Sequence, residues 1–417
     1  MPGGGNLTTL SVATASAALG VMPVFLTGAL AVLVRQDFPL NHSQLGLVIA
    51  CFFAASATFS VPGGALSDCL GPRRSLLLAT TGSVVVLAAV ASVPGHWTHL
   101  LGLMVLSGAV NGLSQPAANL ALARTISSSR QGFAFGIKQS AVPGSTLLAG
   151  LSLPVVGAAF GWRGAFWAAA AIAAMLLAVT ATYIRDPAGP RASRTAGQDV
   201  ITTPRRALVL IALGGGLGTG AATNLGSFLV EAAVASDFSV QSAGLLLSVG
   251  SAVGIAGRLY SGWSADRYPR DQLQRVASMM VIGAVGFAIL SLSGPRALIV
   301  IGTVLAFGAG WGWAGVYVYA LVLLHPHAPG TASGIAQVGA ATGAMLGPAA
   351  FGAIVEHFSF GAGWLAAAAA AAFAGACLLL SSRMVPRVKL SVSPLPTPTS
   401  LKPTALACGP KMNGDAG

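Results

Sequence analysis

Long apolar segments, separated by short polar stretches, follow one another along almost the whole chain. Each segment has roughly 18 or more residues, which is the length that a helix needs to cross a bilayer. The alternation of apolar and polar residues that is typical of strands does not occur. Because lipid offers the backbone no hydrogen-bond partner, every segment must satisfy its own N–H and C=O groups and is therefore predicted to be a spanning helix.

Twelve such segments are predicted, six in each half of the chain. They cover approximately residues 8–34, 43–66, 75–93, 99–123, 132–157 and 164–184, and then 207–235, 242–265, 273–292, 297–324, 330–355 and 361–381. The pattern predicts an all-α membrane protein with twelve transmembrane helices in two six-helix bundles. We place the first bundle at 1–184, a polar cytoplasmic linker at 185–206, the second bundle at 207–382 and a disordered cytoplasmic tail at 383–417.

The two halves repeat each other at a spacing of 198 residues. Gly64 and Asp68 recur as Gly262 and Asp266, and the stretch 132–139 recurs as 330–337 with glycine, isoleucine and glutamine at matching positions. The chain therefore consists of two copies of one unit, which predicts pseudo-symmetric bundles. The copies differ in charge at two positions. Lys138 of the first copy corresponds to Ala336 of the second, and Arg258 of the second copy corresponds to Ser60 of the first.

Composition and charge agree with a membrane protein. Hydrophobic residues make up 54% of the chain and charged residues only 8%, whereas soluble domains have about 25% charged residues. If both termini are cytoplasmic, seventeen basic residues lie on the cytoplasmic side and three, namely Arg35, Arg163 and Arg296, lie outside. This positive-inside bias explains most of the net charge of +12, so a nucleic-acid partner is not needed to explain it.

The two remaining basic residues fall inside predicted helices and have no obvious acidic partner. Lys138 and Arg258 each lie roughly 10 Å inside the cytoplasmic end, at 1.5 Å per residue. A cation at the centre of a spanning helix costs about 2.5–3.5 kcal/mol, so such residues usually face a water-filled cavity. We interpret both as candidate binders of an anionic substrate. Alternatively, Lys138 extends its long stem to the lipid headgroups or to a carbonyl, and Arg258 belongs to a cytoplasmic gate.

Further polar and aromatic residues lie within the predicted helices and could line a cavity near the membrane midplane. The candidates for substrate binding, besides the two cations, are Gln115, Asn119, Gln139, Asn224, Trp313, Tyr317 and Gln337. Gln115 and Asn119 are four residues apart and share a helix face, as do Trp313 and Tyr317. For each of them, ordinary helix packing is the alternative interpretation.

The loop after the second segment carries Gly64, Asp68, Gly71, Arg73 and Arg74, and the second copy carries Gly262, Asp266 and Arg267. This pattern resembles the loop signature of the major facilitator superfamily of secondary transporters, and the resemblance extends from about residue 7 to 382. It implies that these eight residues form a cytoplasmic gate. Cys69 stands where the family usually has a basic residue, and Pro269 replaces the second-copy glycine. Both departures imply that the cytoplasmic gate closes less firmly than is usual in the family.

Two finer resemblances concern the cations. Arg258, four residues before Gly262, is similar to an arginine of monocarboxylate transporters and of the oxalate:formate exchanger, which implies contact with a substrate carboxylate. The stretch 132–144 resembles bacterial facilitators of the cyanate and nitrate/nitrite permease-like type. Both imply a small anion as substrate.

The sequence gives no support for ATP-driven transport, metal binding or enzyme catalysis. The chain has no phosphate-binding loop ending in Gly-Lys-Ser/Thr, which argues against ATP-driven transport. Its four cysteines lack metal-ligand spacing, and no nucleophile motif or paired-carboxylate site is present. We therefore expect no enzyme activity, no catalytic residues, no metal and no cofactor. No charged region precedes the first segment, so a cleaved signal peptide is not expected.

Three functions stay open at this point. The first is a transporter that moves a small, carboxylate-like anion by alternating access, coupled to protons or to a counter-anion. The second is a proton-coupled efflux antiporter, favoured by the pattern Gly343-Ala-Met-Leu-Gly347-Pro348 but weakened by the lack of an acidic residue in the first and fourth segments. The third is a membrane sensor or assembly factor. The expected partners are a small-molecule substrate, protons and the lipid bilayer, and we expect a monomer in a bacterial inner membrane.

Overall fold

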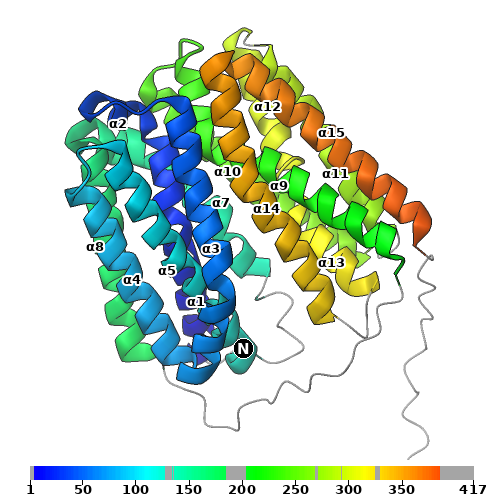
Figure 1. Ribbon diagram of the computed structural model, residues 1–417. Coiled ribbons are helices and arrows are strands. Elements are labelled where there is room, and N and C mark those ends of the chain that lie inside the picture. Colours follow the sequence, from blue (N-terminus) through cyan, green and yellow to red (C-terminus); the bar gives the residue numbers. More distant parts are fainter. Residues whose placement is uncertain are drawn as a thin grey trace, which may run out of the picture. The chain divides into compact units, whose positions relative to one another are not determined.

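The computed structural model describes residues 4–126, 134, 136–184, 203–267, 271–292, 294–324 and 329–385, and all its regular elements are helices. The predicted linker up to residue 202 and the predicted tail from residue 386 lie outside these residues. The first half contains α1 (Gly4–Ala29), α2 (Ala31–Asp37), α3 (His42–Leu70), α4 (Pro72–Ser92), α5 (Trp97–Thr125), α7 (Ala141–Ser152), the π-helical turn η1 (Leu153–Gly157) and α8 (Ala158–Tyr183). Figure 1 shows these helices in blue to green.

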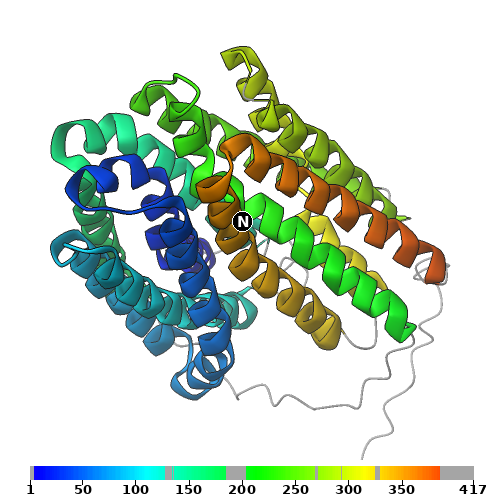
Figure 2. The same cartoon turned by 45° about the horizontal axis from the view of Figure 1, so that its top comes forward.

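The second half contains α9 (Arg205–Val234), α10 (Val240–Arg267), α11 (Gln272–Ser291), α12 (Arg296–Gly308), α13 (Ala314–Leu324), α14 (Pro329–His357) and α15 (Phe360–Met384). In Figures 1 and 2 these helices form a group beside that of the first half. Nine helical stretches among the described residues are long and apolar enough to cross a membrane, and Arg296–Gly308 is a shorter apolar helix. The protein is therefore an all-helical, multi-span membrane protein.

Every predicted segment overlaps a helix or a run of helices, but three of them are interrupted. The predicted segment 8–34 is divided into α1 and α2 by a turn at Leu30. The predicted segment 297–324 is divided into α12 and α13 by a turn that contains Gly310 and Gly312. The predicted segment 132–157 has a turn at Ser140, before α7 begins. Glycine weakens a helix because it has the largest backbone entropy to lose, which explains the break between α12 and α13. Pro143 explains the turn at Ser140, because proline has no N–H for the carbonyl of Gln139 four residues earlier and its ring clashes with that carbonyl.

Local hydrogen bonds define the start of α3. The side chain of Asn41 accepts from the backbone N–H of Gln44 at 2.7 Å, and the side chain of Gln44 accepts from the backbone N–H of Asn41 at 2.9 Å. This capping box satisfies two N–H groups that a helix start otherwise leaves unpaired. It fixes the start of α3 at His42, directly after the capping residue.

The helix bounds reproduce the sequence repeat. α3 begins at His42 and α10 at Val240, which is 198 residues later. α4 and α11 begin 200 residues apart, at Pro72 and Gln272. The register of the repeat thus persists in the folded elements to within a few residues.

The two halves contact each other closely at one end of the bundle. We call this the Arg35 end, after the residue in α2, and the opposite end the Arg73 end, after the residue at the start of α4. A Cβ atom placed on Gly28 of α1 would lie 2.7 Å from the Cα of Ser227 in α9, and one placed on Gly244 of α10 would lie 2.6 Å from the carbonyl oxygen of Gly150 in α7. Only glycine allows backbones to approach so closely.

Candidate functional site

Lys138 lies in the short helical stretch before Ser140, and its side chain is only 4% exposed. Its Nζ atom donates a hydrogen bond to Oε1 of Gln115 in α5, at 2.6 Å. The amide of Gln115 is neutral, so this contact satisfies a donor without cancelling the charge. A buried cation with neutral surroundings is the arrangement that an anionic ligand can complete.

A chain of hydrogen bonds holds Gln115 in place. Its Nε2 donates to Oδ1 of Asn111 and to the main-chain oxygen of Ala17, both at 3.2 Å. Asn111 in turn donates to the hydroxyl of Ser56 in α3, at 2.8 Å. These contacts join α1, α3 and α5 and fix the orientation of the amide oxygen that receives Lys138. Asn111 and Ser56 are not among the predicted site residues, and a lone serine in an apolar helix gives no signal in the sequence.

Arg258 reaches from α10 to the chain segment that carries Lys138. Its Nη1 donates to the main-chain oxygen of Gln139 at 2.8 Å, and its Nε donates to the main-chain oxygen of Trp311 at 3.3 Å. Its guanidinium carbon also lies 5.9 Å from the centre of the Trp311 ring. The two cations, one from each half, therefore meet at the same short stretch of backbone, and these partners of Arg258 are uncharged.

Trp311 connects this region with the first half, and the sequence did not single it out as a site residue. Its ring packs edge-on against Phe25 of α1, with ring centres 6.0 Å apart. The i, i+4 spacing selects Trp313 and Tyr317 instead, and they do lie together, with ring centres 5.4 Å apart. Both are buried and direct their polar atoms to main-chain oxygens, Trp313 Nε1 to Gly310 and Tyr317 Oη to Ile211, each at 2.8 Å.

The other candidate residues differ in their surroundings. Gln139, Asn119 and Gln337 have exposed side chains. Asn224 in α9 is buried, and its Oδ1 atom has no hydrogen-bond partner among the described residues. An unpaired buried amide oxygen is costly and suits a site that a ligand or water completes. The hydrogen bond of Nζ of Lys138 goes to Gln115 and not to any of these four side chains.

At the Arg73 end, the turn between α3 and α4 depends on Gly71. Its φ of 84° lies in the region that other residues rarely adopt. Arg73 then donates from Nε to the main-chain oxygen of Ile184 at 2.9 Å and from Nη2 to that of Ala181 at 3.0 Å. Arg73 thereby ties α4 to the last turn of α8, where a cation is favourable to the helix dipole.

The rest of the predicted gate is open in this conformation. A Cβ atom on Gly64 would meet only Pro116, at 3.9 Å, and one on Gly262 would meet nothing within 4 Å. No neighbouring helix therefore approaches closely at these two glycines. Asp68, Arg74 and Arg267 are exposed, with Arg267 lying over the ring of Trp263 at 5.9 Å. The side chain of Asp266 lies outside the described part of the chain.

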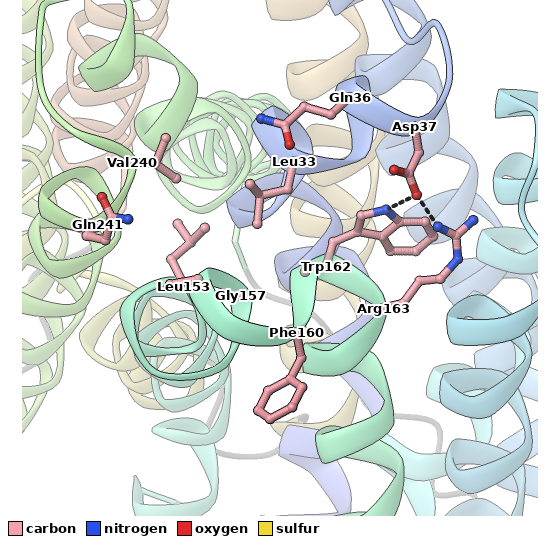
Figure 3. Close-up of a pocket in the computed structure, with 12 residues that line it drawn as sticks. Leu33, Gln36, Asp37, Leu153, Gly157, Phe160, Trp162, Arg163, Val240 and Gln241 are labelled. Carbon is pink, nitrogen blue, oxygen red and sulfur yellow. Dashed lines mark hydrogen bonds and ion pairs between the residues drawn. The ribbon is translucent and has the colours of Figure 1, made fainter.

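A group of ion pairs lies at the Arg35 end. Arg35 and His42 both contact Glu231, and Arg163 pairs with Asp37. A pocket of about 590 Å³ lies beside the second pair, between α2, η1, α8 and the start of α10. Figure 3 shows Trp162 and Arg163 both directed at the carboxylate of Asp37. None of the nine predicted substrate-binding residues lines this pocket.

Within the described residues, no three histidine, cysteine or carboxylate side chains lie close enough to share a metal ion. The site thus offers buried positive charge, amides and aromatic rings.

The long apolar helices define a multi-span membrane protein. A model of the Major Facilitator Superfamily matches residues 8–337, which is well over half of the chain. The chain therefore belongs to the major facilitator superfamily, whose members are secondary transporters and not enzymes.

Solved structures share this fold. The crystal structure of a bacterial homolog to the human lysosomal transporter Spinster, in an inward-facing and unoccupied conformation, matches with a TM-score of 0.74 and 17% identity, over 92% of this chain and 98% of that one. The crystal structure of a D-xylose-proton symporter matches with a TM-score of 0.71 and 17% identity, with the same coverage. At this level of identity, the likeness concerns the fold alone.

Curated relatives match over shorter stretches. "Probable sulfoacetate transporter SauU" of Cupriavidus necator is 31% identical over 37% of this chain and 36% of its own length. "Multidrug resistance protein MdtG" of Enterobacter lignolyticus is 30% identical over 41% of this chain and 43% of its own length. "Voltage-gated purine nucleotide uniporter SLC17A9" of Homo sapiens is 27% identical over 32% of each chain. The matches span less than half the length of these relatives.

Proposed function

We propose that the protein moves a small, carboxylate-like anion across the membrane by alternating access, with Lys138 and Arg258 as its counter-charges. One observation carries this proposal: Arg258 of the second half donates to the main-chain oxygen of Gln139, the residue next to Lys138, and the hydrogen-bond partners of both cations are neutral. A carboxylate between them would gain charge-assisted hydrogen bonds, which are about twice as strong as neutral ones. It would also offset the cost of keeping cations inside the membrane.

The names of two relatives agree with an anionic solute. Sulfoacetate carries a sulfonate and a carboxylate, and purine nucleotides carry phosphates. The proposed substrate site comprises Lys138, Arg258, Gln115, Asn119, Gln139, Asn224, Trp313, Tyr317 and Gln337. Gln115 has a second role in this proposal, because its amide oxygen positions Nζ of Lys138.

We propose the complete topology as predicted from the sequence: twelve spanning helices in two six-helix bundles, at 1–184 and 207–382, with both termini in the cytoplasm of a bacterial inner membrane. The Arg73 end is then cytoplasmic and the Arg35 end is external. The eight loop residues Gly64, Asp68, Gly71, Arg73, Arg74, Gly262, Asp266 and Arg267 form the cytoplasmic gate. Close packing of the halves at the Arg35 end, and open space at Gly64 and Gly262, support an inward-facing state in this structure.

The efflux alternative loses part of its sequence support. Gly343 and Gly347, which suggested an antiporter pattern, pack against the backbone of Gly216 and Gly220 in α9. Helix packing therefore accounts for them. A cationic drug would also have to bind beside the positive charges of Lys138 and Arg258.

Transport in proteoliposomes tests the substrate site. Lys138→Ala should abolish uptake of the anion, and Arg258→Ala should reduce it, because loss of a hydrogen bond to a charged group costs about 1.5–3 kcal/mol, or roughly 10–150-fold in affinity. Gln115→Glu is a sharper variant, since it keeps the shape but places a carboxylate next to Nζ of Lys138 and cancels its charge.

Lys389→Ala, in the predicted tail, serves as the matched control and should transport normally. Unchanged anion transport by Lys138→Ala would contradict the assignment, as would a Gln115→Glu variant that transports as well as the wild type.

A further inference from the structure

A second group of charged residues, unrelated to the proposed substrate site, joins the two halves at the Arg35 end. Arg35 of α2 and His42 of α3 belong to the first half, while Glu231 of α9 and Glu356 of α14 belong to the second. Glu231 lies 2.8 Å from Nε of Arg35 and 3.2 Å from Nδ1 of His42, and its side chain is 4% exposed. Glu356 accepts from the backbone N–H of His42 at 2.8 Å.

The Nδ1 atom of His42 has two competing partners. It lies 3.0 Å from Nη2 of Arg35, which can only donate, and 3.2 Å from Oε2 of Glu231, a carboxylate oxygen. When Nδ1 has no proton, it accepts from Arg35 and its lone pair opposes the carboxylate. When Nδ1 carries a proton, it donates to Glu231, and Arg35 retains its own contact with Oε1 of the same carboxylate.

The protonation of His42 decides the net charge of the cluster. Arg35 contributes one positive charge, and Glu231 and Glu356 contribute two negative charges, so the cluster carries a net charge of minus one while the imidazole is neutral. Protonation of His42 brings it to zero. Phe360 of α15 packs edge-on against the imidazole at 5.1 Å and adds no charge. Asp37, nearby in sequence, pairs with Arg163 instead.

The cluster also lies where a cycle of alternating access would break it. Its members come from both halves, and opening of the Arg35 end must separate Glu231 and Glu356 from Arg35 and His42. The His42 side chain is 24% exposed, so protons from the medium can reach it. Imidazole is the side chain that ordinarily changes charge between about pH 5 and pH 8.

We propose that His42 and Glu231, held by Arg35 at the seam between the halves, bind one proton from the medium at the Arg35 end, and that this proton stabilises closure of that end. The inference rests on the alternating-access function proposed above and adds a proton to it. Since the closed state binds the proton more tightly, closure takes up a proton and is favoured as the pH falls. The effect is lost as the pH rises and His42 becomes neutral.

Distance measurements between spin labels test this proposal without any substrate. Labels at Gly95→Cys and Leu292→Cys lie on opposite halves at exposed positions of the Arg35 end. The background has its native cysteines replaced, namely Cys51, Cys69, Cys377 and Cys408. In lipid nanodiscs, the ratio of short to long distances should rise between pH 8 and pH 6, by up to about tenfold per pH unit for one proton. A wild-type ratio that is independent of pH would overturn the proposal.

Two variants assign the response to this cluster. His42→Gln keeps a hydrogen-bonding side chain that cannot become charged, and it should abolish the pH response. His99→Gln is the matched control, because His99 is also exposed at this end but lies at the start of α5, away from the seam. A response that persists in His42→Gln, or that disappears equally in His99→Gln, would overturn the assignment.

A third variant guards against a folding defect. Glu356→Gln removes one negative charge, so the cluster is already neutral before His42 takes up a proton, and the response should move to lower pH. If His42→Gln does not fold, Glu231→Gln should lose the response, and its persistence there would count against the proposal. Because no anion is needed, failure here leaves the Lys138 site intact, and failure of the Lys138 transport test leaves this result unaffected.

Discussion

At the scale of single residues, Lys138 and Arg258 could be found from the sequence because charge is rare inside apolar segments. Their meeting at Gln139 could not be predicted, since it depends on how two helices from different halves approach each other. For the same reason the sequence selected Trp313 and Tyr317 but missed Trp311. A spacing of four residues identifies a shared helix face, but not the neighbour that this face meets.

The phenol of Tyr317 can be used to test whether a residue chosen by its helix spacing binds substrate through its polar group or only packs inside the protein. Its hydroxyl donates to the main-chain oxygen of Ile211, and its side chain is 2% exposed. Tyr317→Phe should therefore lower the stability by about 1 kcal/mol, the typical net value of a hydrogen bond. Because the hydroxyl is used by Ile211, only the ring of Tyr317 is available to the proposed substrate site, and the ring is kept in this variant, so anion affinity should stay unchanged. Thermal unfolding and ligand titration measure the two effects, and a loss of affinity without a loss of stability would assign the hydroxyl to the substrate.

At the scale of helices, the sequence predicted the positions of the helices well, but it predicted the structural role of their glycines less well. The 198-residue repeat and the apolar segments placed the helices to within a few residues, because lipid forces each apolar segment to form its own backbone hydrogen bonds. The glycine run of residues 214–220 is typical of a helix that can bend. In the structure α9 is one continuous helix, and its glycines allow α14 to approach.

The contact between α9 and α14 leads to a prediction. A Cβ atom on Gly343 would collide with the main-chain oxygen of Gly216. Gly343→Ala should thus force the two helices apart and lower stability by roughly 1–3 kcal/mol, the usual cost of overpacking. Gly144→Ala is the matched control, because a Cβ there meets nothing within 4 Å. Equal melting temperatures of the two variants would show that this close packing contributes little.

At the scale of the whole molecule, composition and the apolar segments were sufficient to predict an all-helical membrane protein, and the resemblance of the loop after the second segment indicated the major facilitator superfamily. They could not predict the conformation. Which end of the molecule is closed depends on contacts between the halves, such as those of Glu231 with Arg35 and His42. In the sequence, Arg35 indicates only the orientation of the chain in the membrane. In the structure, it forms part of the seam that alternating access has to open.

Ligand binding by the purified full-length protein tests the central claim most directly. A ligand that binds only the folded state raises the melting temperature. We expect small carboxylates, including sulfoacetate, to raise the melting temperature of the wild type and of Lys389→Ala, but not that of Lys138→Ala or Gln115→Glu. Stabilisation by cationic or neutral drugs instead, equal in the wild type and in Lys138→Ala, would contradict an anion site at Lys138 and Arg258.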